Sequence, residues 1–366
     1  MGKWGVLGAA VVAARTAWTV RTWQQVRGLP EVGVDGGTVT VVVPARNEAA
    51  NIDRCLDGLR EQDYQGLRIV VVDDASDDGT ADLVRRHAAE DPRVELVLSD
   101  GPPSGWAGKV HALYLGVERT ESDWLVFVDA DTEAAPDLVR RMLAAAVRDD
   151  VDLVSTAGRS TTANAGWWLL LPPTNMLLFE GTSIDGSRGR ALAVGHCILV
   201  SRTAYDQSGG WRAIAGSRAD DVGFATLIRD SGGRTRYVDG SDSLATGGMA
   251  TYGETYRSVR KSVVAGISEF TGGPVSTSLV LGASGVAQVL YGLVPVVTAA
   301  RGSKRGLAAW LAHSVANWVY LRRSRQPVAA AVLGPLASVA FGVLMLDAAW
   351  RALRGEATWK GRDVRG

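Results

Sequence analysis

The sequence predicts an α/β fold, a parallel sheet with helices on both faces, with apolar segments at both ends of the chain. Between residues 38 and 275, short β-branched apolar runs alternate with amphipathic helical stretches. Continuous apolar strands of this kind are typical of a sheet buried on both faces. The ends are marked by tryptophan, because seven of the twelve lie before residue 25 or after residue 305. Trp gathers at membrane–water boundaries, so we expect the ends to contact lipid.

The expected strands and helices follow one another along the middle of the chain. The apolar runs predict strands at 39–43, 69–72, 94–98, 124–128 and 151–156. One-sided apolar spacing between most of them predicts helices at 51–62, 80–90, 109–119 and 136–148. This order predicts an architecture of the nucleotide-binding type.

The apolar ends predict membrane segments. Residues 4–20 carry one charge, Arg15, and the basic residues Arg21 and Arg27 follow, which places the downstream end of an N-terminal anchor in the cytoplasm. A secretory signal is the alternative, although no convincing cleavage site follows. The candidate spans at the other end are residues 275–300, 307–321 and 328–346. The number of spans stays open, because one segment could lie flat on the interface.

The charge balance and the cysteine content exclude other classes of protein. Lys and Arg number 39, as do Asp and Glu, so the formal net charge is zero. A broad nucleic-acid surface needs a basic excess, and we therefore expect no nucleic-acid partner. The two cysteines, Cys55 and Cys197, cannot build a disulfide framework, so nothing requires an oxidising compartment.

Polar clusters follow three of the predicted strands, at residues 44–48 (PARNE), 73–80 (DDASDDGT) and 129–131 (DAD). Ligands of such sheets bind outside the carboxyl ends of the strands, so these clusters are expected to line one site. For residues 73–80 alone, turn formation and helix capping by Ser76 or Asp78 explain the pattern equally well.

Asp129 and Asp131, one residue apart at a strand end, predict a divalent cation, Mg²⁺ or Mn²⁺. Their like charges repel each other, and a hard cation held by carboxylates and substrate phosphates relieves that repulsion. Two other phosphate-binding motifs fail. No G-x-G-x-x-G follows the first strand, and Pro103 stands where a P-loop ending at Gly108-Lys109 requires glycine.

Four motifs in this order resemble the family 2 inverting glycosyltransferases with the GT-A fold: VVVPARNE, VVDDASDDGT, GWAGKVHALYLGV and VFVDADT. The resemblance covers about residues 38–240, depends on the combination of motifs, and implies a Rossmann-like nucleotide-diphospho-sugar transferase domain. PPSGWAGK, the flanking hydrophobic segments and the final ATWKGR look most like the membrane-anchored hopanoid-biosynthesis-associated and carotenoid glycosyltransferase branch.

The resemblance implies roles for the matching residues. It assigns nucleotide-sugar binding to Pro44, Arg46, Glu48, Asp73, Asp74, Lys109 and Asp129, and metal binding to Asp131 and Asp129. Within this set, Asp74 with Asp73 would bind the base and ribose. Asp129 would face the ribose and sugar, and Asp131 would hold the metal on the diphosphate. For Lys109, a solvated lysine at a helix start is the alternative.

The catalytic base of this family usually follows an acidic pair that opens a helix, here Asp220 and Asp221. The resemblance implies that Asp221 is the base. Helix capping competes, but capping needs only one acid. Residues 195–200 match the stretch that shapes the acceptor side, where we expect His196 to be structural. A single carboxylate base without a protein nucleophile is typical of inversion.

One departure from the family concerns the residues after the base. Membrane-bound relatives often carry Gln-x-x-Arg-Trp, whereas residues 256–261 read YRSVRK with no Trp. Arg260, or less plausibly Arg257, would neutralise the diphosphate, and a basic interfacial helix is an equally good interpretation. The processive polysaccharide synthases that keep the full motif are therefore poor guides.

These expectations combine into a membrane-bound glycosyltransferase that moves a sugar from a UDP- or GDP-linked donor to a hydroxyl of a lipid or terpenoid. The apolar, Pro-broken residues 166–181 predict a lipid-facing slot beside Asp221, or simply core. The alternatives are a polyprenyl-phosphate or glycerolipid glycosyltransferase, a sugar-nucleotide pyrophosphorylase, which would lack spans, and a non-catalytic membrane scaffold, which would have lost an acidic motif.

The expected domain order follows from these segments. It comprises an N-terminal membrane anchor (1–30), a GT-A catalytic domain (38–250), a basic interfacial segment (251–274), a C-terminal transmembrane region (275–350) and a basic tail (351–366). We expect a multi-pass protein of the cell membrane with a cytoplasmic catalytic domain.

Overall fold

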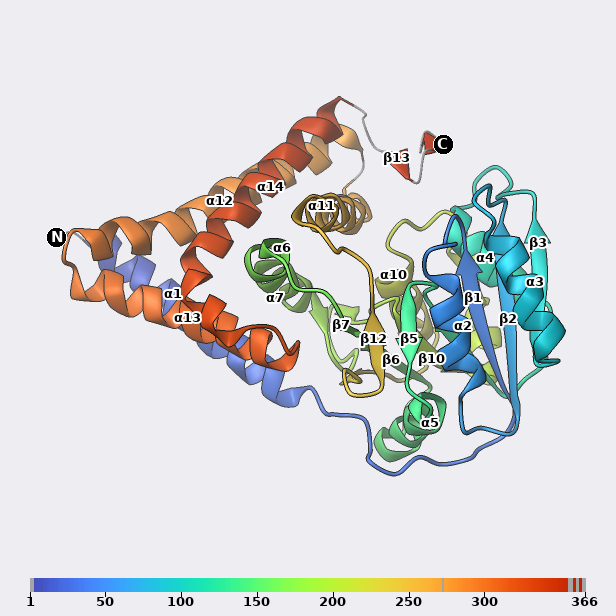
Figure 1. Cartoon of the computed structure of the whole chain (residues 1–366). Coiled ribbons are helices and arrows are strands. Elements are labelled where there is room, and N and C mark those ends of the chain that lie inside the picture. Colours follow the sequence, from blue (N-terminus) through green and yellow to red (C-terminus); the bar gives the residue numbers. More distant parts are fainter. Residues whose placement is uncertain (1–2, 272, 355–357, 360–361, 364–366) are drawn as a thin grey trace. The chain divides into compact units, whose positions relative to one another are not determined.

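The computed structural model describes residues 3–271, 273–354, 358–359 and 362–363 (Figure 1). The chain divides into two units. The sheet unit comprises Val26–Thr161 and Gly181–Gly248, and the helical unit comprises Met1–Gln25, Thr162–Glu180 and Met249–Gly366. Residues 1–2 of the predicted anchor, residue 272 of the interfacial segment, and residues 355–357, 360–361 and 364–366 of the predicted tail lie outside the described residues.

Within the described residues, seven strands form the main sheet, in the order β11-β6-β10-β4-β1-β2-β3. They are β1 (Val39–Ala45), β2 (Leu67–Asp74), β3 (Val94–Ser99), β4 (Trp124–Val128), β6 (Leu153–Ala157), β10 (Cys197–Ser201) and β11 (Thr235–Asp239). The five predicted strands are confirmed as β1, β2, β3, β4 and β6.

The prediction of a parallel sheet is wrong at one strand, because β10 runs antiparallel to both β4 and β6. The other neighbouring strands pair in parallel. The reason lies in the connection before β10. Cys197, its first residue, pairs with Thr156 near the end of β6, so the chain re-enters the sheet at the carboxyl end of β6 and runs back.

Helices cover both faces of this sheet. The predicted helices are confirmed as α2 (Ile52–Arg60), α3 (Thr80–Glu90), α4 (Gly108–Val117) and α5 (Leu138–Asp149), and α8 (Arg202–Ser208), α9 (Gly210–Ala213) and α10 (Asp220–Asp230) complete the layers. Each face of the sheet has its own hydrophobic core, and successive side chains of β1 enter opposite cores. Val41 packs with residues of α2 and α5, and Val42 packs with residues of α4, α9 and α10. The minor strands are β5 (Thr132–Ala134), β7 (Arg159–Ser160), β8 (Thr182–Ser183), β9 (Arg190–Ala191) and β12 (Leu244–Thr246).

The helical unit consists mainly of helices. They are α1 (Lys3–Gln25), α6 (Ala165–Leu169), α7 (Leu171–Gly181), α11 (Tyr252–Ser268), α12 (Pro274–Ala300), α13 (Lys304–Arg323), η1 (Val328–Leu333) and α14 (Gly334–Leu353), with the short strands β13 (Thr358–Trp359) and β14 (Arg362–Asp363). Helices α12 and α14 lie side by side and antiparallel (Figure 1). Ser278 donates to the Ala349 carbonyl at 2.8 Å. A side chain at Gly342 would meet the Gly285 carbonyl, so glycine permits this close approach.

Two segments of the described chain are long and apolar enough to cross a membrane, Pro274–Ala300 and Val328–Leu353. They coincide with two of the expected spans. The expected N-terminal anchor and the span at 307–321 form α1 and α13, and neither helix belongs to this set. In α1, Arg15 forms a two-pronged ion pair with Glu180 of α7. This ion pair joins α1 to α7 within the helical unit.

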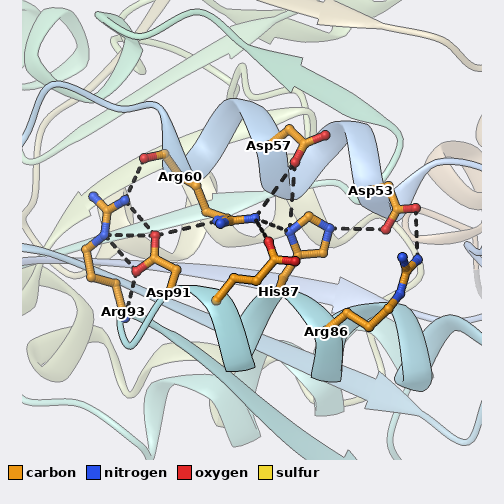
Figure 2. Close-up of polar contacts among 8 residues, drawn as sticks. Asp53, Asp57, Arg60, Arg86, His87, Asp91 and Arg93 are labelled. Carbon is orange, nitrogen blue, oxygen red and sulfur yellow. Dashed lines mark hydrogen bonds and ion pairs between the residues drawn. The ribbon is translucent and has the colours of Figure 1, made fainter.

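A network of ion pairs joins α2 to α3 on one face of the sheet unit (Figure 2). Arg60 donates to Nδ1 of His87 at 2.9 Å and pairs with Glu90 at 3.0 Å. Nε2 of His87 lies 3.1 Å from Asp53. The network fixes α2 against α3. These two helices directly continue the loops that follow β1 and β2.

Asp91 in this network predicts a pH-dependent contribution to stability. Hydrogen bonds from Arg93 hold the pKa of Asp91 at about 2, below its ordinary value. A carboxyl group whose pKa is lowered by folding stabilises the fold above its unfolded pKa, and this stabilisation is lost as the pH falls through the folded value. Asp91→Asn should therefore lower the free energy of unfolding by about 1 kcal/mol at pH 7, after allowance for solvent screening.

Thermal unfolding between pH 2 and pH 7 tests this, and the difference from the parent protein should vanish toward pH 2. Asp82→Asn is the matched control, because Asp82 pairs with Arg85 in the same helix while 81% exposed. Equal losses from the two substitutions at pH 7 would contradict the prediction.

Candidate active site

The carboxyl ends of three neighbouring parallel strands meet at one edge of the sheet. β1 lies between β4 and β2 and is parallel to both, and Ala45 at the end of β1 pairs with Asp73 at the end of β2. The polar clusters after these strands, residues 44–48, 73–80 and 129–131, therefore lie at the same edge, as expected.

The loops after β1 and β2 are interlocked by hydrogen bonds. The backbone N–H groups of residues 47, 48 and 49 donate to Ser76, Thr80 and Asp78, each at 2.9 Å. Asp78 also accepts from the backbone of Thr80 at 3.0 Å. Asp78 therefore makes a local turn bond to the first residue of α3, whereas Ser76 bonds the neighbouring loop. The predicted capping by either side chain is wrong, because the N-cap of α3 is Gly79 and it has no side-chain cap. These four bonds use the side chains of Ser76, Asp78 and Thr80, and none of them uses the carboxylate of Asp73 or Asp74.

Asp73 and Asp74 are buried at the end of β2. Arg46 donates to the carbonyl of Asp74 at 2.9 Å and lies 3.5 Å from its carboxylate. Oδ2 of Asp73 accepts from the backbone of Ser76 at 3.1 Å. Its Oδ1 is buried and accepts no hydrogen bond from any described residue. A buried acceptor of this kind suits an N–H or O–H donor of a bound molecule.

Lys109, at the start of α4, joins two acidic groups. Its Nζ lies 2.8 Å from Oδ1 of Asp129 at the end of β4 and 3.0 Å from Oδ2 of Asp220 at the start of α10. Burial lowers the pKa of Lys109, but the charges of Asp129 and Asp220 outweigh it and hold this pKa well above its ordinary value. Lys109 is thus an ion-paired cation rather than a solvated lysine.

Asp221 opens α10 beside Lys109 and Asp220. One carboxylate oxygen accepts from the backbone N–H of Gly195 at 3.2 Å, and the other accepts from that of Val222 at 2.8 Å. Removal from water and the neighbouring charge of Asp220 raise the pKa of Asp221 to about 6, although Lys109 opposes them. A carboxyl group with this pKa can take up and release a proton near neutral pH.

A cavity of about 10 Å³ lies among these residues, roughly the room that one water molecule needs. Its walls are Pro44, Lys109, Leu113, Phe127, Val128, Asp129, Gly195, Ile198, Trp211 and Asp220. A Cβ at position 195 would lie 2.9 Å from Nζ of Lys109, so any larger residue there would displace this ammonium group. The cavity links the end of β4 to the acidic start of α10.

Asp131 lies close to Asp129 and Glu48. Burial, followed by the charge of Asp129, raises the pKa of Asp131, and the charge of Glu48 adds to the rise. Lys109 relieves part of this repulsion through its ion pair with Asp129. The carboxylate oxygens are of the type that Mg²⁺ or Mn²⁺ prefers. Across residues 3–271, 273–354, 358–359 and 362–363, no group of three or more His, Cys, Asp or Glu could hold a metal ion. The protein therefore offers one or two carboxylates, and substrate oxygens would have to supply the remaining ligands.

Three further expectations concern residues at or beyond this edge. Nδ1 of His196 accepts from the backbone of Gly158 at 3.1 Å, which fits the expected structural role. Arg260 belongs to the helical unit, where it pairs with Asp347 at 2.8 Å, and its contact with a donor stays a prediction. Residues 166–181 form parts of α6 and α7, and Leu170 packs with Leu281 and Phe341 in the core of the helical unit. The slot beside Asp221 likewise stays a prediction.

Sequence reasoning missed His111 on α4. Burial lowers the pKa of His111, and the charge of Asp74 opposes this, so the imidazole lies near that carboxylate. Its ring centroid lies 5.4 Å from that of Trp106. In the sequence, His111 is marked only by its position two residues after Lys109. That spacing does not indicate a contact with Asp74, because the contact arises only when α4 packs against β2.

Residues 40–209 match the family model described as glycosyl transferase family 2. Two curated relatives are 4,4'-diaponeurosporenoate glycosyltransferases. The protein from Staphylococcus haemolyticus is 38% identical over 26% of this chain and 24% of its own length. The protein from Staphylococcus aureus is 24% identical over 89% of this chain and 88% of its own length.

A solved structure agrees with the fold. The mannosyltransferase PcManGT from Pyrobaculum calidifontis, in complex with GDP-Man and Mn²⁺, has a TM-score of 0.58 at 21% identity and covers 95% of this chain and 97% of its own. The first curated relatives are matched over less than half of their own length, between 24% and 46%. These comparisons give an α/β glycosyltransferase fold of the GT-A type with a mixed central sheet.

Proposed function

We propose that this chain, whose residues 40–209 match the model of glycosyl transferase family 2, transfers a sugar from a nucleotide-sugar to an acceptor hydroxyl with inversion. One observation carries this proposal. Lys109 bridges Asp129 and Asp220 at the carboxyl edge of the sheet, with Asp221 beside them. A cation, a strand-end carboxylate and a carboxyl group with a pKa of about 6 together serve a reaction in which a diphosphate leaves and a hydroxyl loses its proton.

The nucleoside would occupy the pocket after β1 and β2. Asp73 and Asp74 would accept hydrogen bonds from the base and ribose, and Pro44, Arg46 and Glu48 would complete the pocket. The buried Oδ1 of Asp73 supports this, because no described residue donates to it. The donor is UDP- or GDP-linked, and the GDP-Man bound to PcManGT makes GDP the first choice to test.

The diphosphate would lie between Lys109 and the metal carboxylates. Asp131, with Asp129, would hold a divalent cation, and the Mn²⁺ in PcManGT supports this choice. When bound, the cation supplies charge stabilisation for the departing diphosphate. Lys109 would exchange a carboxylate contact for a diphosphate oxygen, which keeps its ammonium group paired throughout.

Asp221 would take the proton from the acceptor hydroxyl. Its hydrogen bonds from Gly195 and Val222 orient the carboxylate, and the raised pKa makes it a stronger base than an ordinary Asp. Attack by the deprotonating hydroxyl on the face opposite the diphosphate breaks the anomeric C–O bond and inverts that carbon.

The acceptor is a hydroxyl of a lipid or terpenoid, delivered from a membrane. Two observations support this: the segments Pro274–Ala300 and Val328–Leu353 are apolar enough to cross a bilayer, and two relatives are named for a carotenoid acid. We propose that these two segments attach the protein to the cell membrane, with the sheet unit on the cytoplasmic side.

A two-step experiment tests the function. The full chain in detergent is first heated with UDP or GDP and MnCl₂, and one nucleotide should raise the melting temperature. A panel of sugars on that nucleotide is then incubated with a membrane lipid extract, and mass spectrometry should detect a product heavier by one sugar residue. A chain that binds no nucleotide and yields no such product would refute the proposal.

The rate of transfer should depend on pH through Asp221. The base acts only when it is deprotonated, and burial raises its pKa to about 6. Therefore kcat/KM should be low below pH 5, rise through pH 6 and level off above pH 7. Nucleotide binding measured over the same range separates this effect from loss of the donor. A rate that stays constant between pH 5 and pH 8 would contradict the assignment.

A further inference from the structure

Two polar side chains of α13 are buried in the helical unit with atoms that lack partners. His313 and Asn317 are each 4% exposed, and their spacing places them on the same face of the helix. Nε2 of His313 and Nδ2 of Asn317 have no hydrogen-bond partner in the described part of the chain. Unsatisfied buried polar atoms are rare, so each of these atoms needs a partner from outside the described chain.

The hydrogen-bonding roles of the two atoms are complementary. Nδ1 of His313 lies 3.1 Å from the carbonyl oxygen of Ala309. A carbonyl only accepts, so in the neutral ring Nδ1 carries the proton and Nε2 presents a lone pair. The amide nitrogen of Asn317 can only donate. A hydroxyl group is suited to either atom, because it can donate to Nε2 of His313 or accept from Nδ2 of Asn317.

The surroundings favour a neutral ligand over a charged one. The ring of Tyr291 on α12 lies 4.3 Å from that of His313, and the guanidinium of Arg15 lies 4.7 Å from the Tyr291 ring. Arg15 is already neutralised by the two-pronged pair with Glu180 and also donates to Gln288 at 3.3 Å. No charge is therefore left over to attract a phosphate or a carboxylate.

We propose that His313 and Asn317 bind the hydroxyl of a terpenoid or long-chain alcohol within the helical unit. The apolar body of such a molecule suits this unit, whose helices expose large apolar side chains such as Leu290 (53%), Leu311 (57%) and Val332 (55%). Both residues belong to the helical unit, whereas Asp73, Lys109 and Asp221 belong to the sheet unit. Binding of the alcohol requires no sugar donor and no transfer.

The test uses the full chain in detergent, with tritiated farnesol as the probe and farnesene as the matched hydrocarbon without a hydroxyl. The parent protein should bind farnesol at least about tenfold more tightly than farnesene, the effect expected of one good hydrogen-bonded group. Asn317→Leu and His313→Phe, which keep the size and the ring, should each lower farnesol affinity about tenfold and remove the preference. Ser314→Ala is the control, because that hydroxyl already donates to the Trp310 carbonyl at 3.1 Å, and it should change nothing.

The main competing explanation is that an ordered water satisfies both atoms. In that case Asn317→Leu and His313→Phe would lower the melting temperature of the ligand-free protein and leave the farnesol preference unchanged. Our proposal expects ligand-free Asn317→Leu to melt no lower than the parent, since it replaces the unpartnered amide nitrogen by an apolar group. His313→Phe also loses the contact of Nδ1 with the Ala309 carbonyl, so that variant is judged by its farnesol preference alone. Equal binding of farnesol and farnesene by the parent would overturn the proposal without any variant. Because no nucleotide is present, this outcome is separate from a failure of the proposed transfer.

Discussion

Asp221→Asn should slow sugar transfer by about 10²–10⁴-fold and leave nucleotide binding intact. The amide oxygen of Asn can still accept from Gly195 N–H, which the carboxylate does at 3.2 Å, so the start of α10 should keep its position. The amide cannot take up the proton of the acceptor hydroxyl, and a positioned base typically contributes about 10²–10⁴-fold to the rate. We therefore expect kcat to fall by about that factor, with little change in the nucleotide dissociation constant.

Single-turnover transfer and nucleotide titration on the same preparations provide the measurement. Asp230→Asn is the matched control, because Asp230 ends the same helix and pairs with Arg229 while 59% exposed. The control should retain parental rates. A fall of less than tenfold in Asp221→Asn would show that another group accepts the proton, and Asp220 would be the next residue to replace.

Phe224→Ala should destabilise the sheet unit more than any surface substitution. Phe224 on α10 is fully buried and stacks on Trp211 of α9, with ring centroids 4.0 Å apart and planes 19° apart. It also meets the edge of Phe127 on β4 at 5.7 Å. This aromatic cluster packs α10, which carries Asp220 and Asp221, against β4, the strand that Asp129 follows.

Truncation of a buried Phe to Ala costs about 3–5 kcal/mol through lost transfer energy and the cavity left behind. For a unit of this size, that corresponds to a fall of about 6–20 °C in melting temperature. Scanning calorimetry in detergent measures it, with Val147→Ala as the control, because Val147 on α5 is 68% exposed. If the two variants melted at the same temperature, the aromatic cluster would not be what holds α10.

The regular elements of the sheet unit were predictable from local sequence. The strands β1, β2 and β4 are continuous apolar runs, as expected of strands buried on both faces. In α3 and α5 the apolar residues recur every three to four positions, as expected of helices with one buried face. β10 was not predicted as a strand, although its residues CILVS are apolar. Its antiparallel direction depends on where the chain returns after residues 162–180, and no local pattern carries that information.

The candidate site was predictable in part for a similar reason. Asp73, Asp74, Asp129 and Asp131 stand at strand ends, and a sheet of known strand order brings such ends together. The contact of Lys109 with Asp129 and Asp220 joins residues far apart in the chain, and neither spacing nor composition indicates it. The position of His111 near Asp74 depends in the same way on the packing of α4.

By itself, the sequence determined which segments become strands and helices, which of them are apolar enough for a bilayer, and which acidic residues end up at the carboxyl edge. These properties follow from periodicity and composition, and both are local. Only the tertiary structure decided the direction of β10, the pairing of Arg15 with Glu180, and the raised pKa of Asp221. Each of these arises from burial or from a neighbour distant in the chain, and the free energy of a buried charge is set by whatever the fold places beside it.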